Sequence, residues 1–297
     1  MNRKLAVWIL TLLCATALLV LGLVGWIGSE RALNPHYYKY KWSLDTFPDL
    51  HPQRIKIHSK TGVNLTGRFF AGDGKATVLL ASGYGDTEDQ MLPFAEFLHH
   101  GGYNVLTYNM RSRGGSEGQY VTLGLLEQAD MISVVDYLST RPDVDAGHIG
   151  ALGISMGGAI AILAAAKDRR IKAVVDDCGF SDAPGVIAAS FEHFIHLPAF
   201  PFAPVTVWIA DMRAGIDVNT VRPMDVIGNI SPRPVLIIHG LDDAVVPAEN
   251  SERNFAHARQ PKELWLVPHA RHGNAHTIAK AAYEKRVLQF FGKNLDR

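Results

Sequence analysis

The pentapeptide Gly153-Ile154-Ser155-Met156-Gly157 decides the fold of this chain because of the segments that flank it. Residues 148–152 are mostly apolar and favour a strand, whereas residues 158–167 are rich in alanine and isoleucine and favour a helix. A strand that turns directly into a helix forces the turn residue into a strained backbone conformation, which only small neighbours permit. We therefore expect Ser155 to be exposed in a tight turn, as a candidate nucleophile.

A catalytic serine needs a base that takes its proton and an acidic group that orients this base. Two apolar runs later in the chain, 234–238 and 263–267, each predict a buried strand that ends in polar residues. The first strand is followed by a carboxylate, Asp243, and the second by a histidine, His272. The chain order is therefore nucleophile, acid and base.

From about Arg54 to Phe291 the chain resembles the α/β-hydrolase superfamily, and in particular its esterase and serine-aminopeptidase-like branch with a helical cap. The resemblance is carried by the pentapeptide, by residues 239–247 (His-Gly-Leu-Asp-Asp-Ala-Val-Val-Pro) and by the pair His272-Gly273, in the superfamily's chain order. It implies an α/β fold with a mostly parallel central sheet, helices on both faces and a helical cap insertion. It also implies a catalytic triad and no cofactor.

Neighbouring residues compete for two places in this triad. The pattern HG-x-x-D-x-x-V-P of the family places the acid on Asp243, which leaves Asp242 as a solvated loop carboxylate. The family's base usually precedes a glycine, which favours His272 over His269 and His276. A metal site built from the three histidines is a weaker alternative, since no cysteine or carboxylate stands at ligand spacing around them.

Acyl transfer also needs hydrogen-bond donors that face the developing oxyanion. One predicted donor is the backbone N–H of Met156, at the start of the helix after the nucleophile. By resemblance, the other is the backbone N–H of Tyr84, in the glycine turn after the strand 77–81. Relatives commonly carry histidine where this chain has Ser82, but donation by a backbone amide does not depend on that side chain.

Strands and helices alternate through the rest of the chain, as a parallel sheet with crossover helices requires. Two period-two runs, 54–58 and 63–70, predict an antiparallel hairpin at the sheet edge. Further strands are expected at 104–109 and 171–176, and a helix from Leu123 to Leu138.

The alternation stops at about 180–221, where many relatives insert the cap. This segment is rich in proline and in large aromatic side chains: Phe191, Phe194, Phe200, Phe202 and Trp208. These aromatics either line a pocket for the substrate or pack the cap onto the body. One sequence does not say which face of the cap is which, so both alternatives stay open.

The N-terminus carries 23 uncharged residues from Leu5 through Ile27. As a helix this run spans roughly 34 Å, enough to cross a bilayer, and Trp8 and Trp26 stand near its two ends as interfacial anchors. A cleavable signal peptide is the alternative, disfavoured because the run is long and no clear A-x-A site ends it. We expect a membrane anchor at 1–28, a linker at 29–52 and a hydrolase domain at 53–297.

The charges that flank the apolar run favour a cytoplasmic N-terminus and a catalytic domain outside the cytosol. Arg3 and Lys4 precede the run, although Arg31, Lys39 and Lys41 after it argue partly against this orientation. The two cysteines do not decide the compartment. One lies in the apolar run, and the other follows a core strand and is expected to be buried.

Composition excludes several other classes of protein. The formal net charge is zero, so nothing indicates nucleic-acid binding, and the oligomeric state is not predicted. The sequence therefore predicts a membrane-anchored serine hydrolase that acts on a small-molecule or lipid-like ester, or on an amide. An acyltransferase with the same triad, and a non-catalytic membrane-tethered binding protein on this fold, are the alternatives.

Overall fold

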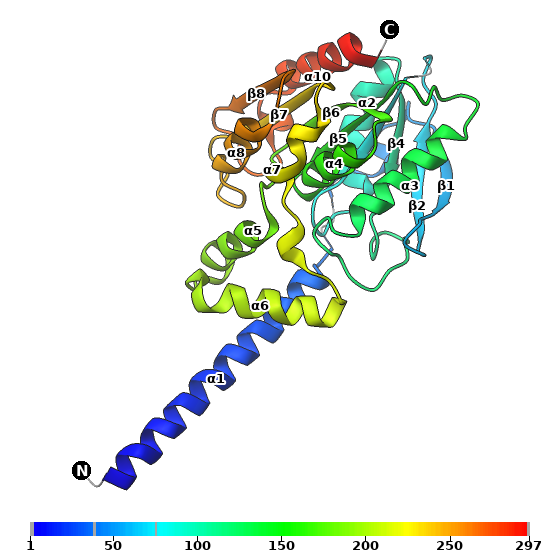
Figure 1. Cartoon of the computed structure of the whole chain (residues 1–297). Coiled ribbons are helices and arrows are strands. Elements are labelled where there is room, and N and C mark those ends of the chain that lie inside the picture. Colours follow the sequence, from blue (N-terminus) through cyan, green and yellow to red (C-terminus); the bar gives the residue numbers. More distant parts are fainter. Residues whose placement is uncertain (1–2, 38–39, 75, 296–297) are drawn as a thin grey trace.

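Eight strands form one sheet within residues 3–37, 40–74 and 76–295, which the computed structural model describes (Figure 1). Their order across the sheet is β1-β2-β4-β3-β5-β6-β7-β8. Strands β3 to β8 pair in parallel, and the predicted hairpin of β1 and β2 is antiparallel and lies at one edge. The strands are β1 Gln53–His58, β2 Asn64–Phe70, β3 Thr77–Ala81, β4 Asn104–Tyr108, β5 Ile149–Ile154, β6 Ile171–Asp177, β7 Val235–Gly240 and β8 Lys262–Val267.

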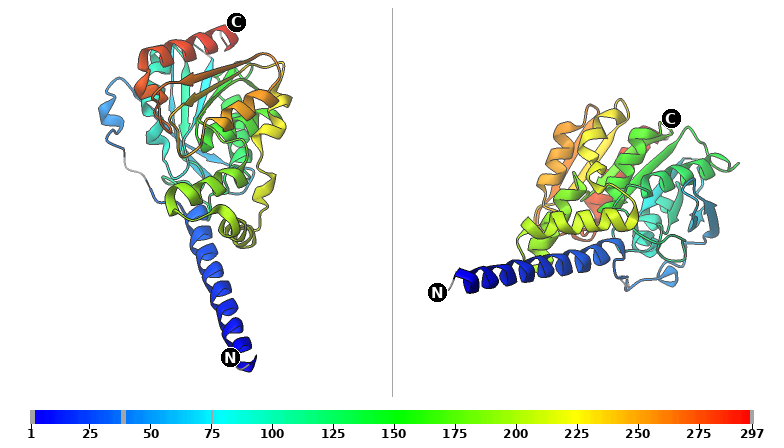
Figure 2. Two further views of the ribbon diagram at one scale, coloured as in Figure 1. Left: turned by 90° about the vertical axis from the view of Figure 1, so that its left-hand side faces the viewer. Right: turned by 60° about the horizontal axis from the view of Figure 1, so that its bottom comes forward.

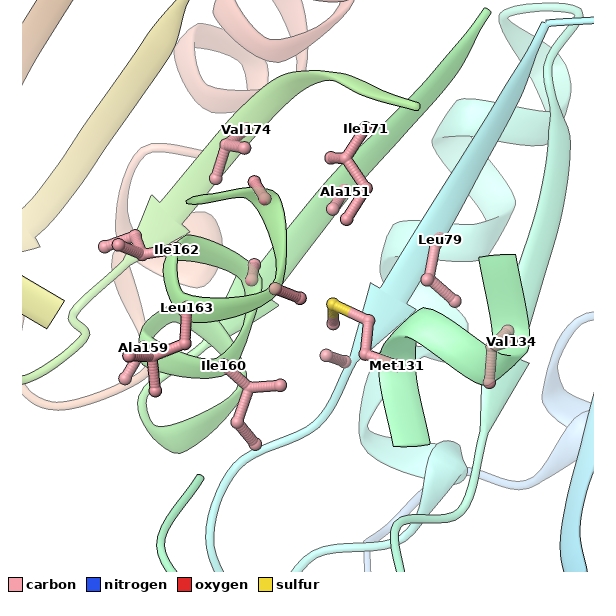
Figure 3. Packing of buried hydrophobic residues seen from close by; sticks show 14 of the residues in the cluster. Leu79, Met131, Val134, Ala151, Ala159, Ile160, Ile162, Leu163, Ile171 and Val174 are labelled. Atoms are coloured by element: carbon pink, nitrogen blue, oxygen red, sulfur yellow. The ribbon is translucent and has the colours of Figure 1, made fainter. Parts of the chain in front are cut away.

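Helices cover both faces of this sheet, as the sequence predicts. Helices α3 (Glu127–Ser139) and α4 (Met156–Lys167) pack on one face, and α2 (Leu92–His100) and α10 (Lys280–Leu295) pack on the other. Figure 3 shows Met131 of α3 and Ile160 of α4 in one apolar cluster with Leu79 of β3 and Ala151 of β5. The central strands are apolar along their whole length because both of their faces are covered.

The remaining elements of the body are short. They are η1 (Leu44–Thr46), η2 (Glu88–Met91), η4 (Val218–Thr220), α7 (Pro223–Val226), η5 (Ile227–Ile230), α8 (Glu249–His257) and α9 (Ala275–Ile278). Helix α3 begins at Glu127, four residues later than predicted, because the Glu127 carboxylate accepts the backbone N–H groups of Thr122 and Gly124 at 2.7 and 2.9 Å. These bonds hold the preceding residues in a loop.

The predicted cap insertion lies between β6 and α7 and is helical. It contains α5 (Ala183–Ser190), a π-helical turn η3 (Phe191–Ile195) and α6 (Ala199–Ala214). Figure 1 shows these helices at the end of the body from which α1 projects. The Asp182 carboxylate caps α5 by accepting the backbone N–H of Gly185 at 2.8 Å.

Helix α1 (Arg3–Leu33) projects away from the body (Figures 1 and 2). Its length and its exposed apolar surface make it a candidate membrane span, a pattern that a signal sequence shares. The helix continues to Leu33, so the first residues of the predicted linker are helical. Lys39, one of the charges used for the orientation, lies outside the described residues.

The last third of α1 packs against the cap and the body (Figure 2). Two glycines allow this close approach, because a Cβ atom on Gly25 would lie 2.7 Å from Val205 Cγ1, and one on Gly28 would lie 2.7 Å from Thr206 Oγ1. At the end of the helix, the Leu33 carbonyl accepts the backbone N–H of Val121 at 2.9 Å. The candidate span and the cap therefore form one packed unit.

Candidate active site

Ser155 occupies the turn between β5 and α4, as the sequence predicts. Its φ of 54° and ψ of −119° are strained for a residue with a side chain. The strain is held by the backbone, since Ser155 N–H donates to the Asp177 carbonyl at 2.7 Å and the Ser155 carbonyl accepts the N–H of Gly158 at 3.0 Å. The turn therefore presents the hydroxyl at the carboxyl edge of the sheet.

The glycines around Ser155 are required by close backbone contacts. A Cβ atom on Gly153 would lie 2.1 Å from the carbonyl carbon of Gly157, and one on Gly157 would lie 2.2 Å from the Ala81 carbonyl oxygen. Real Cβ atoms do not approach other atoms so closely. The pentapeptide therefore fixes the turn and also sets β3 against the first turn of α4.

The structure brings the three predicted triad residues together. His272 Nε2 lies 2.9 Å from Ser155 Oγ, and His272 Nδ1 lies 2.7 Å from Asp243 Oδ2. Asp243 follows β7 and His272 follows β8, so both side chains reach Ser155 from the carboxyl ends of neighbouring parallel strands. Gly273, with a φ of 66°, allows the tight turn that the sequence predicts after the histidine.

Asp243 is buried and is held as a carboxylate. Its Oδ1 accepts the backbone N–H groups of Val245 and Val246, both at 2.9 Å. Burial acts to raise the pKa of Asp243, but the hydrogen bonds from His239 and His272 outweigh it and bring the pKa well below its usual range. A permanently ionised carboxylate is suited to orient the imidazole of His272.

His239 is a part of this site that the sequence analysis missed. Its side chain is fully buried, and Nε2 lies 2.7 Å from the Val246 carbonyl and 3.2 Å from Asp243 Oδ2. Because both neighbours are acceptors, Nε2 carries a proton, while Nδ1 contacts the Ser251 hydroxyl. Burial acts to lower the pKa of His239, yet the bond to Asp243 raises it overall. The only sequence signal was its place at the start of the segment 239–247.

The two predicted oxyanion donors lie on adjoining segments. Met156 is the first residue of α4, where backbone N–H groups have no acceptor within the helix. Tyr84 lies in the turn after β3, which Gly157 contacts through the carbonyls of Ala81 and Ser82. The Tyr84 hydroxyl donates to the Arg31 carbonyl at 2.5 Å, so this turn is also tied to the end of α1.

Two family models match overlapping parts of the chain. The model of the X-Pro dipeptidyl-peptidases (S15 family) matches residues 71–190, and that of the BAAT / acyl-CoA thioester hydrolase C-terminal region matches residues 132–262. Together the matches run from β3 past β7, and they include Ser155 and Asp243.

Relatives and solved structures match the chain over most of its length. The chain is 28% identical over 250 residues to YqkD of Bacillus subtilis (83% of this chain, 81% of the relative), and 26% identical over 247 residues to YfhR of Escherichia coli K12 (80% of each). The esterase Pf2001 of Pyrococcus furiosus superimposes with a TM-score of 0.73 at 26% identity, over 89% of this chain and 98% of that chain. The chain belongs to the α/β-hydrolase superfamily. It has the fold predicted for it.

Other candidate residues of this α/β-hydrolase lie apart from the triad. Asp242 and His269 are exposed, and Asp242 Oδ2 lies 3.9 Å from His269 Nδ1. His276 Nε2 lies 2.9 Å from Glu284 Oε1. Cys178 is buried, as expected, but its sulfur lies within 4.8 Å of ligand atoms of Asp243 and His272. Because the two latter residues already bond each other, this group is better suited to proton transfer than to metal binding.

Three further carboxyl groups of this α/β-hydrolase surround the site, and the sequence analysis singled out none of them. Burial raises the pKa of Asp176 to about 7 and those of Asp177 and Asp86 to about 6. Asp177 Oδ2 accepts the hydroxyl of Tyr283 at 2.8 Å, and Asp176 Oδ1 accepts the backbone N–H of Gly179 at 3.0 Å. The floor of the site therefore contains carboxyl groups that titrate near neutral pH.

Proposed function

We propose that this protein is a membrane-anchored serine hydrolase that cleaves carboxylic esters, and less readily amides, through an acyl-enzyme on Ser155. In the first step Ser155 Oγ forms a bond to the acyl carbon, and His272 Nε2 takes the hydroxyl proton. The tetrahedral intermediate then loses the alcohol, which receives this proton from His272. Asp243 stabilises the imidazolium and keeps Nδ1 protonated throughout.

The second step regenerates the enzyme. A water molecule gives a proton to His272 Nε2 as its oxygen bonds to the acyl carbon, and the acid leaves as Ser155 regains its proton from His272. The backbone N–H groups of Met156 and Tyr84 donate to the oxyanion in both steps. Water supplies the only other reactant, so the atoms balance without a cofactor.

The observation that carries this proposal is the continuous line of hydrogen bonds from Ser155 through His272 to Asp243. The names of the similar proteins support it, because a peptidase, a thioester hydrolase and an esterase all act on carboxylic acid derivatives. For membrane placement, the proposal takes α1 as a single-pass anchor with a cytoplasmic N-terminus and an extracytoplasmic catalytic domain. Arg3 and Lys4 support that orientation.

Replacement of the nucleophile tests the catalytic part. Ser155→Ala should lower turnover of p-nitrophenyl butyrate by about a millionfold and abolish labelling by a fluorophosphonate probe. Ser139→Ala, which removes a hydroxyl bonded only within and beside α3, serves as the matched control and should retain both signals. Equal labelling of the wild type and Ser155→Ala would refute the proposal.

A further inference from the structure

The cap carries a group of large apolar side chains that nothing in the described part of the chain covers. Phe200 is 78% exposed, and Phe194, Trp208 and Met212 are each 59% exposed. We call these four residues the cap surface. Both alternatives for the cap aromatics therefore fail for three of them, because Phe194, Phe200 and Trp208 neither pack onto the body nor lie enclosed in a pocket. Of the other two aromatics predicted for the cap, Phe191 is buried and Phe202 is half-buried.

The exposed side of α6 adjoins its contact with α1. Because an α-helix turns by about 100° per residue, Trp208 and Met212 lie on one face of α6, beside the face that carries Val205 and Ile209. The buried residues of the helix lie on the opposite face. Val205 and Ile209 lie against Gly25 of α1. The buried residues on the opposite side are Ala203, Val207 and Ala210. The apolar surface of α6 is thus continuous with that of α1.

Charged side chains are absent from the outward face of α6. Asp211 and Arg213 are the two charged residues of this helix, and both are engaged by the protein itself. Asp211 Oδ1 accepts the backbone N–H of Val218 at 3.0 Å, while Arg213 pairs with Glu30, donates to Ser29 at 2.8 Å and stacks on Trp26. The outward face is therefore left apolar, which is unusual for a surface that meets water.

We propose that the cap surface is a membrane-docking surface that lies in the interfacial layer of a phospholipid bilayer beside α1. The bilayer is the occupant that the geometry favours, because α1 exposes apolar side chains such as Trp8, Leu18 and Leu19 around its axis, and α6 continues that surface. A second copy of the chain is not needed to cover it.

The depth of the contact fits an interfacial position. Helix α6 meets α1 at Gly25 and Gly28, where the apolar run ends at Ile27 and Trp26 stands as a predicted interfacial anchor. Helices that lie in the membrane plane bury their apolar face about 5–10 Å into the boundary between headgroups and acyl chains.

This position has a consequence for the substrate, which rests on the proposed function. The turn that holds the Tyr84 oxyanion donor is bonded to the last turn of α1, so the reaction centre lies beside the interface. Esters with an acyl chain dissolved in the bilayer then reach the site without crossing water. We infer that the substrate class is membrane-resident acyl esters.

Site-directed labelling tests the docking without relying on activity. Trp208→Cys and Met212→Cys, made in a Cys14→Ser background, are spin-labelled in the full chain after reconstitution into phosphatidylcholine/phosphatidylglycerol vesicles. Cys178 is buried and stays unlabelled. Lys285→Cys on α10, exposed at the opposite end of the body, is the control (Figure 1).

Docking predicts that labels at 208 and 212 collide several-fold more with oxygen than with a water-soluble nickel chelate, and that the label at 285 shows the reverse. Labels at 208 and 212 with the accessibility of the 285 label would overturn the proposal. Dipolar broadening between labels at 208, removed by dilution with unlabelled chain, would instead identify a second copy as the occupant and overturn it as well.

A pair of activity measurements separates the docking from the catalytic proposal. Trp208→Glu should lower hydrolysis of a long-chain ester in vesicles several-fold, because a carboxylate is unfavourable in the interface. It should leave hydrolysis of soluble p-nitrophenyl acetate unchanged, and Trp208→Phe should restore the rate in vesicles. An equal loss on both substrates would contradict the docking, whereas no activity in the wild type would contradict only the proposed function and the substrate class.

Discussion

The turn at Ser155 and the cap surface are both rich in apolar and small residues, yet they are held by different means. The turn is closely packed, and its geometry is possible because Gly153 and Gly157 have no Cβ atom. In the cap surface, Trp208 and Met212 instead project outward from α6, whose other side is buried, and Phe194 and Phe200 lie in or next to the turn before it. The turn is packed entirely within the chain, while the cap surface, in the docking proposed above, packs against a bilayer.

This difference in packing determines which substitutions each region tolerates. In a close-packed interior, a change of one methyl group is felt by the whole environment. On an exposed apolar surface, the same change alters affinity for a partner and leaves folding nearly unaffected. The following four predictions use this contrast, beginning with the largest effect.

Asp243→Asn should have the largest effect on catalysis. The amide keeps the shape of the acid but no longer stabilises the imidazolium of His272, so kcat for an ester should fall by about ten-thousandfold. Steady-state kinetics measure the loss. Asp242→Asn changes the exposed neighbouring carboxylate and should retain nearly full activity; if it lost as much as Asp243→Asn, the choice of acid would be wrong.

Gly157→Ala should have the largest effect on folding. The new Cβ atom meets the Ala81 carbonyl at 2.2 Å, and the free energy of unfolding should fall by about 3 kcal/mol, although alanine is the better helix former. Urea unfolding measures this change. The control Gly147→Ala lies in an exposed turn and should leave the free energy of unfolding nearly unchanged. An unchanged free energy of unfolding in Gly157→Ala would contradict the close packing of the turn at Ser155.

The buried carboxyl of Asp176 should make stability depend on pH. Its pKa is raised to about 7, so the folded state keeps a proton that the unfolded chain releases above about pH 4. Stability is therefore fully present at low pH and is lost as pH rises through about 7. Between pH 5 and pH 8 the wild type should lose on the order of 2 kcal/mol more than Asp176→Asn in urea unfolding. The exposed Asp73→Asn should follow the wild type, and parallel curves for all three proteins would contradict the assignment.

Polar replacements on the cap surface should have the smallest effect on folding. The double variant Trp208→Gln/Met212→Gln changes two side chains that are each more than half exposed, so its free energy of unfolding in a mild detergent should change by less than about 0.5 kcal/mol. Val207→Ala, on the buried side of the same helix, should lower it by about 2 kcal/mol. A strong loss in the double variant would place this surface within the fold.

The sequence predicted the fold and the arrangement of Ser155, Asp243 and His272 because each depends on local patterns. A strand, a small-residue turn and a helix stand next to one another in the chain, and parallel strands bring their carboxyl ends to one edge. The role of His239 was not predictable in this way. Its contact with Asp243 depends on how the loop of residues 241–246 folds back over the end of β7, which no periodicity encodes.

The boundaries at the N-terminus show the same limit. The predicted anchor ends at residue 28 because the apolar run ends at Ile27, but the helix continues to Leu33. The added turn is supported by partners far along the chain, since Arg213 bonds to Ser29 and Glu30. Likewise, the face of α6 that points outward follows from its contact with α1, and a single sequence does not contain that contact.

Two hydrogen bonds, from Tyr84 to the Arg31 carbonyl and from Val121 to the Leu33 carbonyl, join the end of α1 rigidly to the catalytic body. A flexible tether of the same length would let the catalytic body tumble freely above its attachment point. In the membrane-anchored protein proposed above, these bonds make the tilt of α1 set the angle and height at which Ser155 is held. A shortened protein that starts after Leu33 would lose both hydrogen bonds, so the conformation of its loop at Tyr84 would differ from that of the full chain.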